Sequence, residues 1–291
     1  MVNCTCMYVK TLQQEDIAKL LPPRPRDCSK RDNGKGLLIA GSAGFSGAAV
    51  MAACAALRAG VGTLKTVVPA PVAGAFYALP EAMCAPYPGQ DWDENAAEFV
   101  QPYIDDATAL AIGPGLGRGR GREGLLRAAL AAGKPAVVDA DGLFALSKIE
   151  DKRSVLHGRV VLTPHLGEME RLAGIPAREI GARQEELAAR YAAEWGCVVL
   201  LKNYESVIAA PDGRAARNVS GNPGLAKGGS GDVLAGITLA LLAQGLAPFE
   251  AACAAAYLLG ASANEAMGLL SERMLMARDV IDAVERTLDQ F

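Results

Sequence analysis

The sequence predicts an α/β protein in which a mostly parallel central sheet is covered by helices on both faces. Short apolar runs of strand length alternate with Ala- and Leu-rich stretches of helical length. The apolar runs lack the polar alternation of a half-exposed strand, so both faces of each strand are expected to be buried. With 291 residues, of which 51% are hydrophobic and 21% charged, the chain has the size and composition of one large α/β domain.

The elements begin with an N-terminal extension, residues 1–35, which we expect to pack on a single domain spanning 1–291. Within it, residues 11–20 are expected to form a short helix, because the proline-rich stretch 22–25 would end it. Parallel strands are expected at residues 36–40, 64–68, 109–112, 136–139, 160–163 and 197–201. Helices are expected between them, at residues such as 47–59, 123–132 and 182–195. Right-handed crossovers follow from such connections.

The pattern changes in the last third of the chain. Two strand-like runs, Ser206–Ala210 and Arg214–Val219, flank Pro211-Asp212-Gly213, whose Asp-Gly pair is typical of a hairpin turn. We therefore expect an antiparallel hairpin at the edge of the otherwise parallel sheet. Two long apolar helices are expected after it, at about 232–244 and 249–267.

Charge argues against nucleic acid as a partner. The net charge is −3, and no block of lysines and arginines forms the basic patch that DNA- and RNA-binding proteins usually carry. Arg118, Arg120 and Arg122, interleaved with glycine in one short segment, come nearest to such a block. Two interpretations of these arginines stay open, a solvated loop and a local attraction for an anion.

Cysteine usage and hydropathy indicate a reduced, cytoplasmic protein. The seven cysteines are scattered and form no CxxC pair, and there are two histidines, so we expect no zinc site. Cys4 and Cys6 are at most a weak indication of a metal. The N-terminus lacks the layout of a signal peptide, and no apolar run is long enough to span a bilayer. We therefore expect no membrane association.

The strongest chemical signal is the run Gly221–Asp232, which leads directly into the apolar helix expected at Val233–Leu242. Gly229–Gly231 would expose several backbone N–H groups at the helix N-terminus, where phosphate is attracted. Asp232 would then act as a general base on a substrate hydroxyl while these groups stabilise the transferred phosphoryl group. The structural alternative is a glycine-rich loop whose acidic residue caps the helix.

Two glycine-rich segments follow earlier strands and could also meet a ligand. Gly41-Ser42 ends one strand and Gly47-Ala48 opens the next helix, so a bulky ligand could approach the backbone between them. Gly113–Gly117 places three glycines at another strand end, in a pattern that is not a dinucleotide fingerprint. The structural alternatives are helix-start packing in the first case and a simple turn in the second.

Titratable residues follow two further strands. His165 comes after Thr163-Pro164 at the carboxyl end of a strand, where ligands bind in open α/β sheets, or it caps the helix that starts there. Asp139 and Asp141 could cap a helix or hold magnesium through water. Glu168 could likewise have a binding role or be an ordinary glutamate of a helix start.

Together these segments resemble the ADP/ATP-dependent NAD(P)H-hydrate dehydratases, a branch of the ribokinase-like superfamily. The resemblance runs from about Lys30 to the last helices. Five ordered motifs make it specific: Leu37–Ser42, Ala111–Gly117, Val138–Leu143, Leu162–Glu168 and Ala226–Asp232. It implies a three-layer α/β/α fold and a homo-oligomer, a tetramer. The family often carries a fused epimerase domain, for which we expect no room in these 291 residues.

The resemblance implies repair of a nicotinamide cofactor that has gained water across a ring double bond. With Mg²⁺, ADP or ATP would phosphorylate the ring hydroxyl of hydrated NADH or NADPH, and phosphate would then leave. Asp232 would be the base, and Gly229, Ser230 and Gly231 the anion hole. The residues implied to bind the hydrated cofactor are Ala48, Gly115, Gly117, His165 and Asp232. Those implied to bind the adenine nucleotide are Lys202, Asn203, Tyr204, Glu205, Ser206 and Gly231, and no metal ligand is assigned.

A few positions depart from the family pattern. Asn203 stands where glycine usually follows the lysine, and Ser206 and Ser230 stand where threonine is usual. Asparagine tolerates a left-handed backbone better than most residues, and serine keeps the hydroxyl, so we expect function to be retained with altered nucleotide affinity or preference. Ser29 and Arg31 depart from a family loop on the substrate side.

Two other functions stay open. A small-molecule kinase of the same fold, acting on a thiazole alcohol or a vitamin, would share the Gly-x-Gly-Asp turn but stop at a stable phosphorylated product. A non-catalytic nucleotide sensor would have no need of Asp232 or Lys202. The Gly113–Gly117 and Thr163–Glu168 motifs favour the dehydratase over both.

Overall fold

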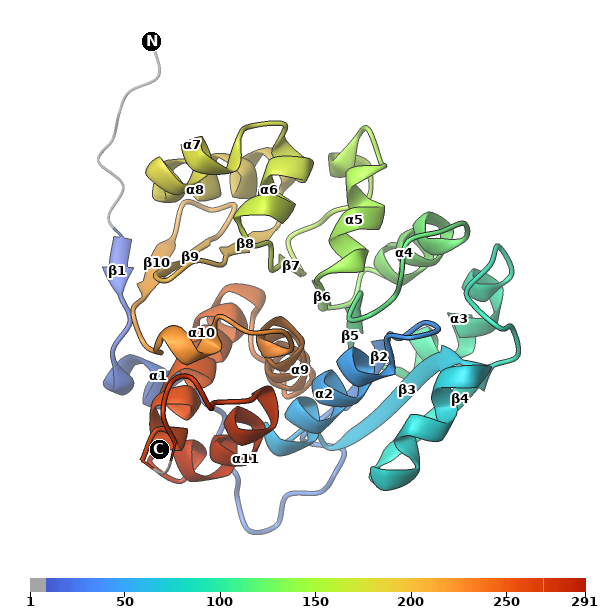
Figure 1. Cartoon of the computed structure of the whole chain (residues 1–291), viewed down its shortest axis with the longest axis horizontal. Helices are drawn as coiled ribbons and strands as arrows, with labels where there is room; N and C mark the ends of the chain where they lie inside the picture. The colour runs from blue at the N-terminus through green and yellow to red at the C-terminus, as the bar shows by residue number, and fades with distance from the viewer. Residues whose placement is uncertain (1–8, 269) are drawn as a thin grey trace.

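The computed structural model describes residues 9–268 and 270–291, and within them a ten-stranded sheet forms the centre (Figure 1). The strands lie in the order β1-β10-β9-β8-β7-β6-β5-β2-β3-β4. Neighbours are parallel except where β9 pairs antiparallel with β8 and β10. The strands are β1 (Val9–Thr11), β2 (Lys35–Ile39), β3 (Thr63–Pro69), β4 (Ala82–Tyr87), β5 (Ala109–Ile112), β6 (Ala136–Val138), β7 (Val160–Leu162), β8 (Val198–Leu201), β9 (Ser206–Ala209) and β10 (Ala215–Asn218).

Helices cover both faces of this sheet (Figure 1). One layer holds α3 (Ala96–Asp106), α4 (Arg122–Ala131), α5 (Asp141–Ser147), α6 (Leu166–Ala173), α7 (Ala177–Ala182) and α8 (Gln184–Trp195). The opposite layer holds α1 (Gln14–Leu20), α2 (Ser46–Arg58), α9 (Ser230–Ala243), α10 (Pro248–Ala266) and α11 (Ala277–Leu288). Short 3₁₀ segments are η1 (Ala70–Ala78), η2 (Lys152–Ser154) and η3 (Pro223–Leu225).

Alternate residues of the central strands supply two separate cores. In β2, Leu38 packs with the α2 and α9 side, whereas Leu37 and Ile39 pack with the α3 to α8 side, and all three are fully buried. A strand buried on both faces needs no polar alternation, which is why these runs read as continuous apolar segments. The predicted three-layer arrangement with a mostly parallel sheet is confirmed.

The predicted hairpin is confirmed, but it does not form the edge of the sheet. β9 and β10 pair antiparallel from Ser206 opposite Asn218 to Ala209 opposite Ala215. Beyond them, β1 pairs parallel with β10, so the N-terminal extension supplies the edge strand. The helix expected over residues 11–20 accordingly begins only at Gln14. A strand of three residues is too short to show a period in the sequence, and it forms because β10 offers it unpaired backbone groups.

The opposite edge strand, β4, was not predicted from the sequence. It pairs with β3 and contains Pro86, a residue that sheets accept mainly at their edges. Cys4 and Cys6 lie outside the described residues. Over residues 9–268 and 270–291, none of the helices combines the length and the apolar character needed to cross a membrane.

Candidate active site

Three neighbouring parallel strands end at the same edge of the sheet and bring a charged pair together there. Asp139 follows β6, Thr163 follows β7 and Lys202 follows β8. The Lys202 Nζ donates a hydrogen bond to Asp139 Oδ1 at 2.7 Å, and the Thr163 hydroxyl donates to the same oxygen at 2.7 Å. The Asp139 side chain is only 2% exposed, so this is an ion pair held away from water.

Glu168, in the first turn of α6, is the second carboxylate beside Lys202. Its Oε2 lies 3.7 Å from Lys202 Nζ. Burial raises the pKa of Glu168, and the charge of Lys202 offsets part of that rise. Burial lowers the pKa of Lys202, but the negative charges of Asp139 and Glu168 outweigh it, so the pKa of Lys202 is raised. Lys202 therefore carries its charge at neutral pH.

The N-terminus of α9 lies directly against this pair. Gly229, the N-cap residue, has a φ of +101°, and a Cβ there would lie 2.7 Å from Met51 Sδ, so only glycine fits without strain. A Cβ on Gly231 would lie 3.4 Å from Lys202 Nζ and 3.5 Å from Asp139 Oδ2. The first N–H groups of a helix have no partner in the helix, so this end can bind an anion beside the Lys202 ammonium.

Asp232 stands in the first turn of α9, half-buried, next to the same charges. Burial raises its pKa to about 7, and the negative charge of Asp139 adds to the rise, while Lys202 opposes it. A carboxylate with a pKa near neutrality is suited to accept a proton from a substrate hydroxyl. The geometry thus places a carboxylate of raised pKa next to a helix N-terminus and a fixed cation.

The two glycine-rich segments also come together. Gly115 has a φ of +60°, and a Cβ there would lie 3.0 Å from the Cβ of Ala48. The buried Ser42 hydroxyl donates to the Gly115 carbonyl at 2.9 Å. The Gly117 N–H donates to Asp141 Oδ2 at 2.9 Å. Ala48 and Gly115, two of the residues expected to hold the hydrated cofactor, are therefore neighbours. The Asp141 carboxylate binds the neighbouring loop rather than the N-terminus of its own helix.

Between Asp139 and Asp141, Ala140 has a strained backbone. Its φ of 48° and ψ of −117° are unfavourable for a residue with a Cβ, and among the described residues it is the only non-glycine with positive φ. Nearby, a Cβ on Gly113 would lie 1.8 Å from the Asp139 carbonyl oxygen. Strain of this kind persists where the surrounding structure fixes the chain, often at functional sites. The two flanking aspartates have different partners: Asp139 accepts from Thr163 and Lys202, and Asp141 accepts from Gly117 and Arg118.

Replacing Ala140 with glycine is expected to stabilise the folded protein by about 1 kcal/mol, because relief of strain exceeds the entropy that glycine adds to the unfolded chain. Chemical denaturation measures the change. Ala107→Gly is the matched control: Ala107 has an ordinary φ of −73°, so the same substitution should lower stability. A loss of stability in both variants would contradict the assignment of strain to Ala140.

His165 acts as the N-cap of α6, which was one of its two open interpretations. Its Nδ1 accepts hydrogen bonds from the N–H groups of Gly167 at 3.0 Å and Glu168 at 3.3 Å. In return its backbone N–H donates to Glu168 Oε2 at 2.8 Å. The imidazole is 59% exposed, and its Nε2 lies 3.5 Å from Glu168 Oε1.

The segment Lys202–Ser206 forms the β8–β9 turn. Asn203 does not have the left-handed backbone for which asparagine was considered suitable, since no described residue other than Ala140 and glycines has positive φ. Its side chain instead accepts from the Tyr204 N–H at 2.9 Å and donates to Gln184 at 3.0 Å. Tyr204 is 85% exposed, and Glu205 pairs with Arg217 at 3.4 Å.

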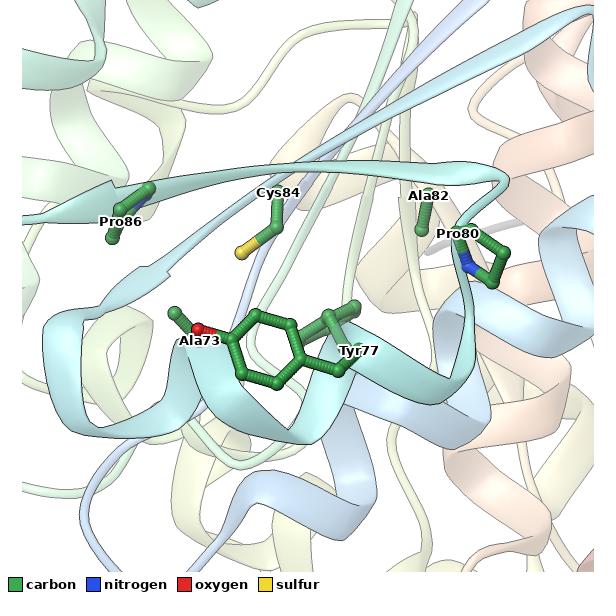
Figure 2. Close-up of a pocket in the computed structure, with 7 residues that line it drawn as sticks. Ala73, Tyr77, Pro80, Ala82, Cys84 and Pro86 are labelled. Carbon is green, nitrogen blue, oxygen red and sulfur yellow. The ribbon is translucent and has the colours of Figure 1, made fainter.

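A hollow of about 340 Å³ lies away from these groups, against the edge strand β4 (Figure 2). Figure 2 shows the ring of Tyr77 on η1 facing Cys84 and Pro86 across it. No charged side chain lines it, and two strands, β2 and β3, lie between β4 and β5.

Comparison with known proteins identifies the family. Residues 36–285 match the family model of the NAD(P)H-hydrate dehydratases. The chain belongs to the NAD(P)H-hydrate dehydratase family. The matched range contains each of the five motifs named above.

Among relatives in the NAD(P)H-hydrate dehydratase family, a bifunctional NAD(P)H-hydrate repair enzyme of Moorella thermoacetica is 42% identical over 267 residues, covering 90% of this chain and 50% of its own length. The chain thus spans about half the length of the first curated relatives it matches. The ADP-dependent (S)-NAD(P)H-hydrate dehydratase of Bacillus subtilis is 35% identical, covering 98% of this chain and its full length.

Solved structures agree with this family assignment. A crystal structure of the ADP/ATP-dependent NAD(P)H-hydrate dehydratase from Bacillus subtilis, co-crystallised with ATP and Mg²⁺, superposes with a TM-score of 0.86 at 34% identity and covers 98% of this chain and 99% of that one. An Arabidopsis thaliana ribokinase, at 12% identity and a TM-score of 0.56, shares the fold alone, covering 87% of this chain and 99% of that one. The ribokinase-like fold expected for a member of the NAD(P)H-hydrate dehydratase family is confirmed.

The structure adds two residues to the site of this NAD(P)H-hydrate dehydratase family member that the sequence did not single out. Gln184, at the start of α8, donates to the Glu205 carbonyl at 2.9 Å and accepts from Asn203, so it holds the β8–β9 turn. Phe45, 59% exposed, lies beside Gly115. Gln184 matches no sequence pattern that indicates a functional residue. Phe45 lies between Gly41 and Gly47, in a segment already identified as a candidate by its glycines.

Proposed function

We propose that this chain catalyses the ADP- or ATP-dependent dehydration of (S)-NADHX and (S)-NADPHX, the hydrated forms of NADH and NADPH. The observation that carries the proposal is the site itself: Asp232, with a pKa of about 7, adjoins the α9 N-terminus and the buried Lys202–Asp139 pair. Family membership supplies the substrate class. The full-length match to an ADP-dependent (S)-NAD(P)H-hydrate dehydratase supports the reaction.

In the proposed first step, Asp232 accepts the proton of the ring hydroxyl as that oxygen attacks the terminal phosphorus of the nucleotide. The bond between this phosphorus and its bridging oxygen breaks, and the N–H groups of Gly229, Ser230 and Gly231 stabilise the transferred charge. In the second step the carbon–oxygen bond to phosphate breaks and the neighbouring ring carbon loses a proton. The ring double bond is thereby restored.

Mg²⁺ fits the carboxylates of this site. The oxygen ligands of Asp139 and Glu168 suit Mg²⁺, which usually keeps several waters and binds one or two carboxylates together with substrate phosphates. When bound it would neutralise charge between the phosphates. The match to a structure co-crystallised with ATP and Mg²⁺ supports this requirement.

We assign the two ligands to the two halves of the site. The hydrated cofactor is bound by Ala48, Gly115, Gly117, His165 and Asp232. The nucleotide is bound by Gly231 and the β8–β9 turn, namely Lys202, Asn203, Tyr204, Glu205 and Ser206. The contact between Gly115 and Ala48 and the closeness of Gly231 to Lys202 Nζ support this division.

We further propose that residues 1–291 act as one domain, in the cytoplasm, and as a homotetramer. The odd number of cysteines supports a reducing compartment. Exposed apolar side chains along η1 and β4, Tyr77 and Met83, support association of chains there. Measurement of the molecular mass in solution tests this prediction, and a monomer at micromolar concentration would contradict the tetramer.

The function is tested by incubating the protein with hydrated NADH, Mg²⁺ and either ATP or ADP. We expect NADH absorbance to rise with one phosphate released per NADH formed. Failure to recover NADH would contradict the dehydratase. Turnover of ATP only with a vitamin-like alcohol would indicate the small-molecule kinase instead, and nucleotide binding without turnover would indicate the sensor.

The pH dependence of kcat/KM follows from Asp232. Burial raises its pKa to about 7, and the base must be ionised to accept a proton, so kcat/KM should rise with pH and reach half its maximum near pH 7. The measurement is the rate at low substrate concentration from well below to well above that pH. A rate that is flat through pH 7 would show that Asp232 does not act as the base.

A further inference from the structure

The three arginines of the 118–122 segment have different environments. Arg122 is buried, with its Nη2 2.6 Å from Asp91 Oδ2 and its Nη1 donating to the Trp92 carbonyl at 2.7 Å. Arg120 is exposed, and its nearest carboxylate is that of Glu94 at 3.6 Å. Arg122 is therefore structural and Arg120 is a solvated charge. Of the three, Arg118 alone pairs with Asp141, the carboxylate that also accepts from the Gly117 N–H.

Arg118 joins two other cations around a single aromatic ring. The Arg118 guanidinium lies 4.5 Å from the centre of the Phe144 ring, the Lys148 Nζ at 5.0 Å and the Arg171 guanidinium at 5.5 Å. Phe144 and Lys148 belong to α5, Arg171 to α6 and Arg118 to the loop after β5, and α5 packs beside α6 (Figure 1). We call Arg118, Lys148 and Arg171 the basic cluster.

The basic cluster is short of negative charge. Asp141 pairs with Arg118 at 3.2 Å, whereas Lys148 and Arg171 form no ion pair within residues 9–268 and 270–291. Contact with an aromatic face compensates an exposed cation by only about 0.5–1 kcal/mol. All three cations lie within 5.5 Å of the same ring centre, so their positive potentials add in this region. Such a group of cations is stabilised when an anion binds between them, and phosphate oxygens are the acceptors that arginine and lysine bind best.

The cluster is also continuous with the loop to which we assign the hydrated cofactor. The Asp141 carboxylate accepts from the Gly117 N–H through Oδ2 and from Arg118 through Oδ1. Gly117 and Arg118 are consecutive, so a ligand that reaches Gly115 and Gly117 meets the guanidinium next. A dinucleotide that places its nicotinamide ring at Ala48 and Gly115 has phosphate groups further along its length.

We propose that Arg118, Lys148 and Arg171 bind a phosphate group of the hydrated dinucleotide. The inference rests on the proposed function, which supplies the dinucleotide. Two phosphate sources share this chemistry: the diphosphate bridge, present in both hydrated cofactors, and the 2′-phosphate, present only in the NADPH form. If the 2′-phosphate is the ligand, the cluster also sets the preference between the two substrates.

Kinetics of the Lys148→Gln/Arg171→Gln variant test the subsite. We expect its KM for hydrated NADPH to rise by at least about threefold, the effect of losing exposed contacts between a cation and a phosphate. If the KM for hydrated NADH rises equally, the cluster binds the diphosphate bridge. If only the KM for hydrated NADPH rises, the cluster binds the 2′-phosphate. Arg120→Gln is the matched control, because it removes an exposed arginine outside the cluster and should leave both KM values unchanged.

Two results would overturn the proposal: KM values unchanged in the cluster variant, or a rise only in the KM for the nucleotide. A binding measurement that needs no turnover tests the phosphate subsite even if the proposed dehydratase activity is absent. The binding measurement is calorimetric titration with ADP-ribose and with ADP-ribose 2′-phosphate. A non-hydrolysable ATP analogue and Mg²⁺ fill the nucleotide site during the titration. We expect the cluster variant to bind at least one of the two ligands more weakly than the wild type does. This result is independent of NADH recovery, and equal binding by wild type and variant would overturn the subsite.

Discussion

Asp232→Asn should abolish turnover while leaving nucleotide binding intact. Asparagine keeps the shape of the side chain but cannot take the hydroxyl proton, and loss of a general base typically costs about 10²–10⁴-fold in rate. The nucleotide contacts that we assign lie on the β8–β9 turn and the backbone of Gly231, which the change does not touch. Single-turnover kinetics and calorimetric titration with an ATP analogue measure the two quantities. Retained turnover would show that Asp232 is not the general base.

The same variant should be more stable than the wild type above neutral pH. Burial raises the pKa of Asp232 from 3.8 to about 7, so the folded state holds this proton while the unfolded state has lost it. The wild type therefore loses stability as pH rises from about 4 to about 7, by at most ~4 kcal/mol. Asparagine does not ionise, so its advantage should grow over that range and then stay constant. Thermal unfolding at several pH values measures it.

Asp27→Asn is the control for this stability difference, because Asp27 is exposed and outside the site. Its unfolding temperature should follow that of the wild type at every pH. An Asp232→Asn protein that is no more stable than the wild type above pH 7 would show that ionisation of Asp232 in the folded protein is not costly. The role of Asp232 in turnover would then need a different explanation, because the burial that raises its pKa is also what makes it suitable as a base.

Lys202→Met should destabilise the protein by about 3–5 kcal/mol, the usual cost of removing one partner of a buried ion pair. Asp139 is 2% exposed and Lys202 20% exposed, so the Asp139 carboxylate would be left without its main counter-charge. Methionine keeps most of the length of the lysine side chain, which limits the loss of packing. Chemical denaturation measures the change, and turnover should be lost as well because a cation beside the α9 N-terminus is removed.

A second substitution separates the charge effect from packing. The double variant Asp139→Asn/Lys202→Met removes both charges, so it should recover most of the lost stability without recovering turnover. Lys35→Met is the matched control, because it breaks an exposed pair with Asp106 that should contribute less than about 1 kcal/mol. A Lys202→Met protein as stable as the Lys35→Met protein would contradict the importance of the buried pair.

Much of this fold could be predicted because its central elements have local signals. The strands at 109–112 and 160–163 are continuous apolar runs, and the helix at 230–243 begins at a glycine-rich turn. β4 and α3 were missed: each contains a proline, and the burial pattern of β4 does not alternate as in a regular half-buried strand. β1 was missed because three residues carry no pattern, and only the free edge of β10 gives them a partner.

The sequence by itself located the residues that we propose carry the chemistry. The run ending in Asp232, the glycines at 113–117 and the lysine after β8 were all visible as local patterns at strand or helix ends. Local patterns specify backbone conformation and burial, and strand ends of a parallel sheet necessarily meet at one edge. The candidate site could therefore be located before its geometry was known.

Only the tertiary structure decided how those residues affect one another. Asp139 and Lys202 are 63 positions apart, yet they form a buried pair. Burial and the negative charge of Asp139 raise the pKa of Asp232, and the charge of Lys202 opposes that rise. The tertiary structure also separated Arg118 from Arg120 and Arg122, which look alike in the sequence. Charge interactions and desolvation depend on distances through space, and these distances are fixed only when strands and helices distant in sequence have packed together.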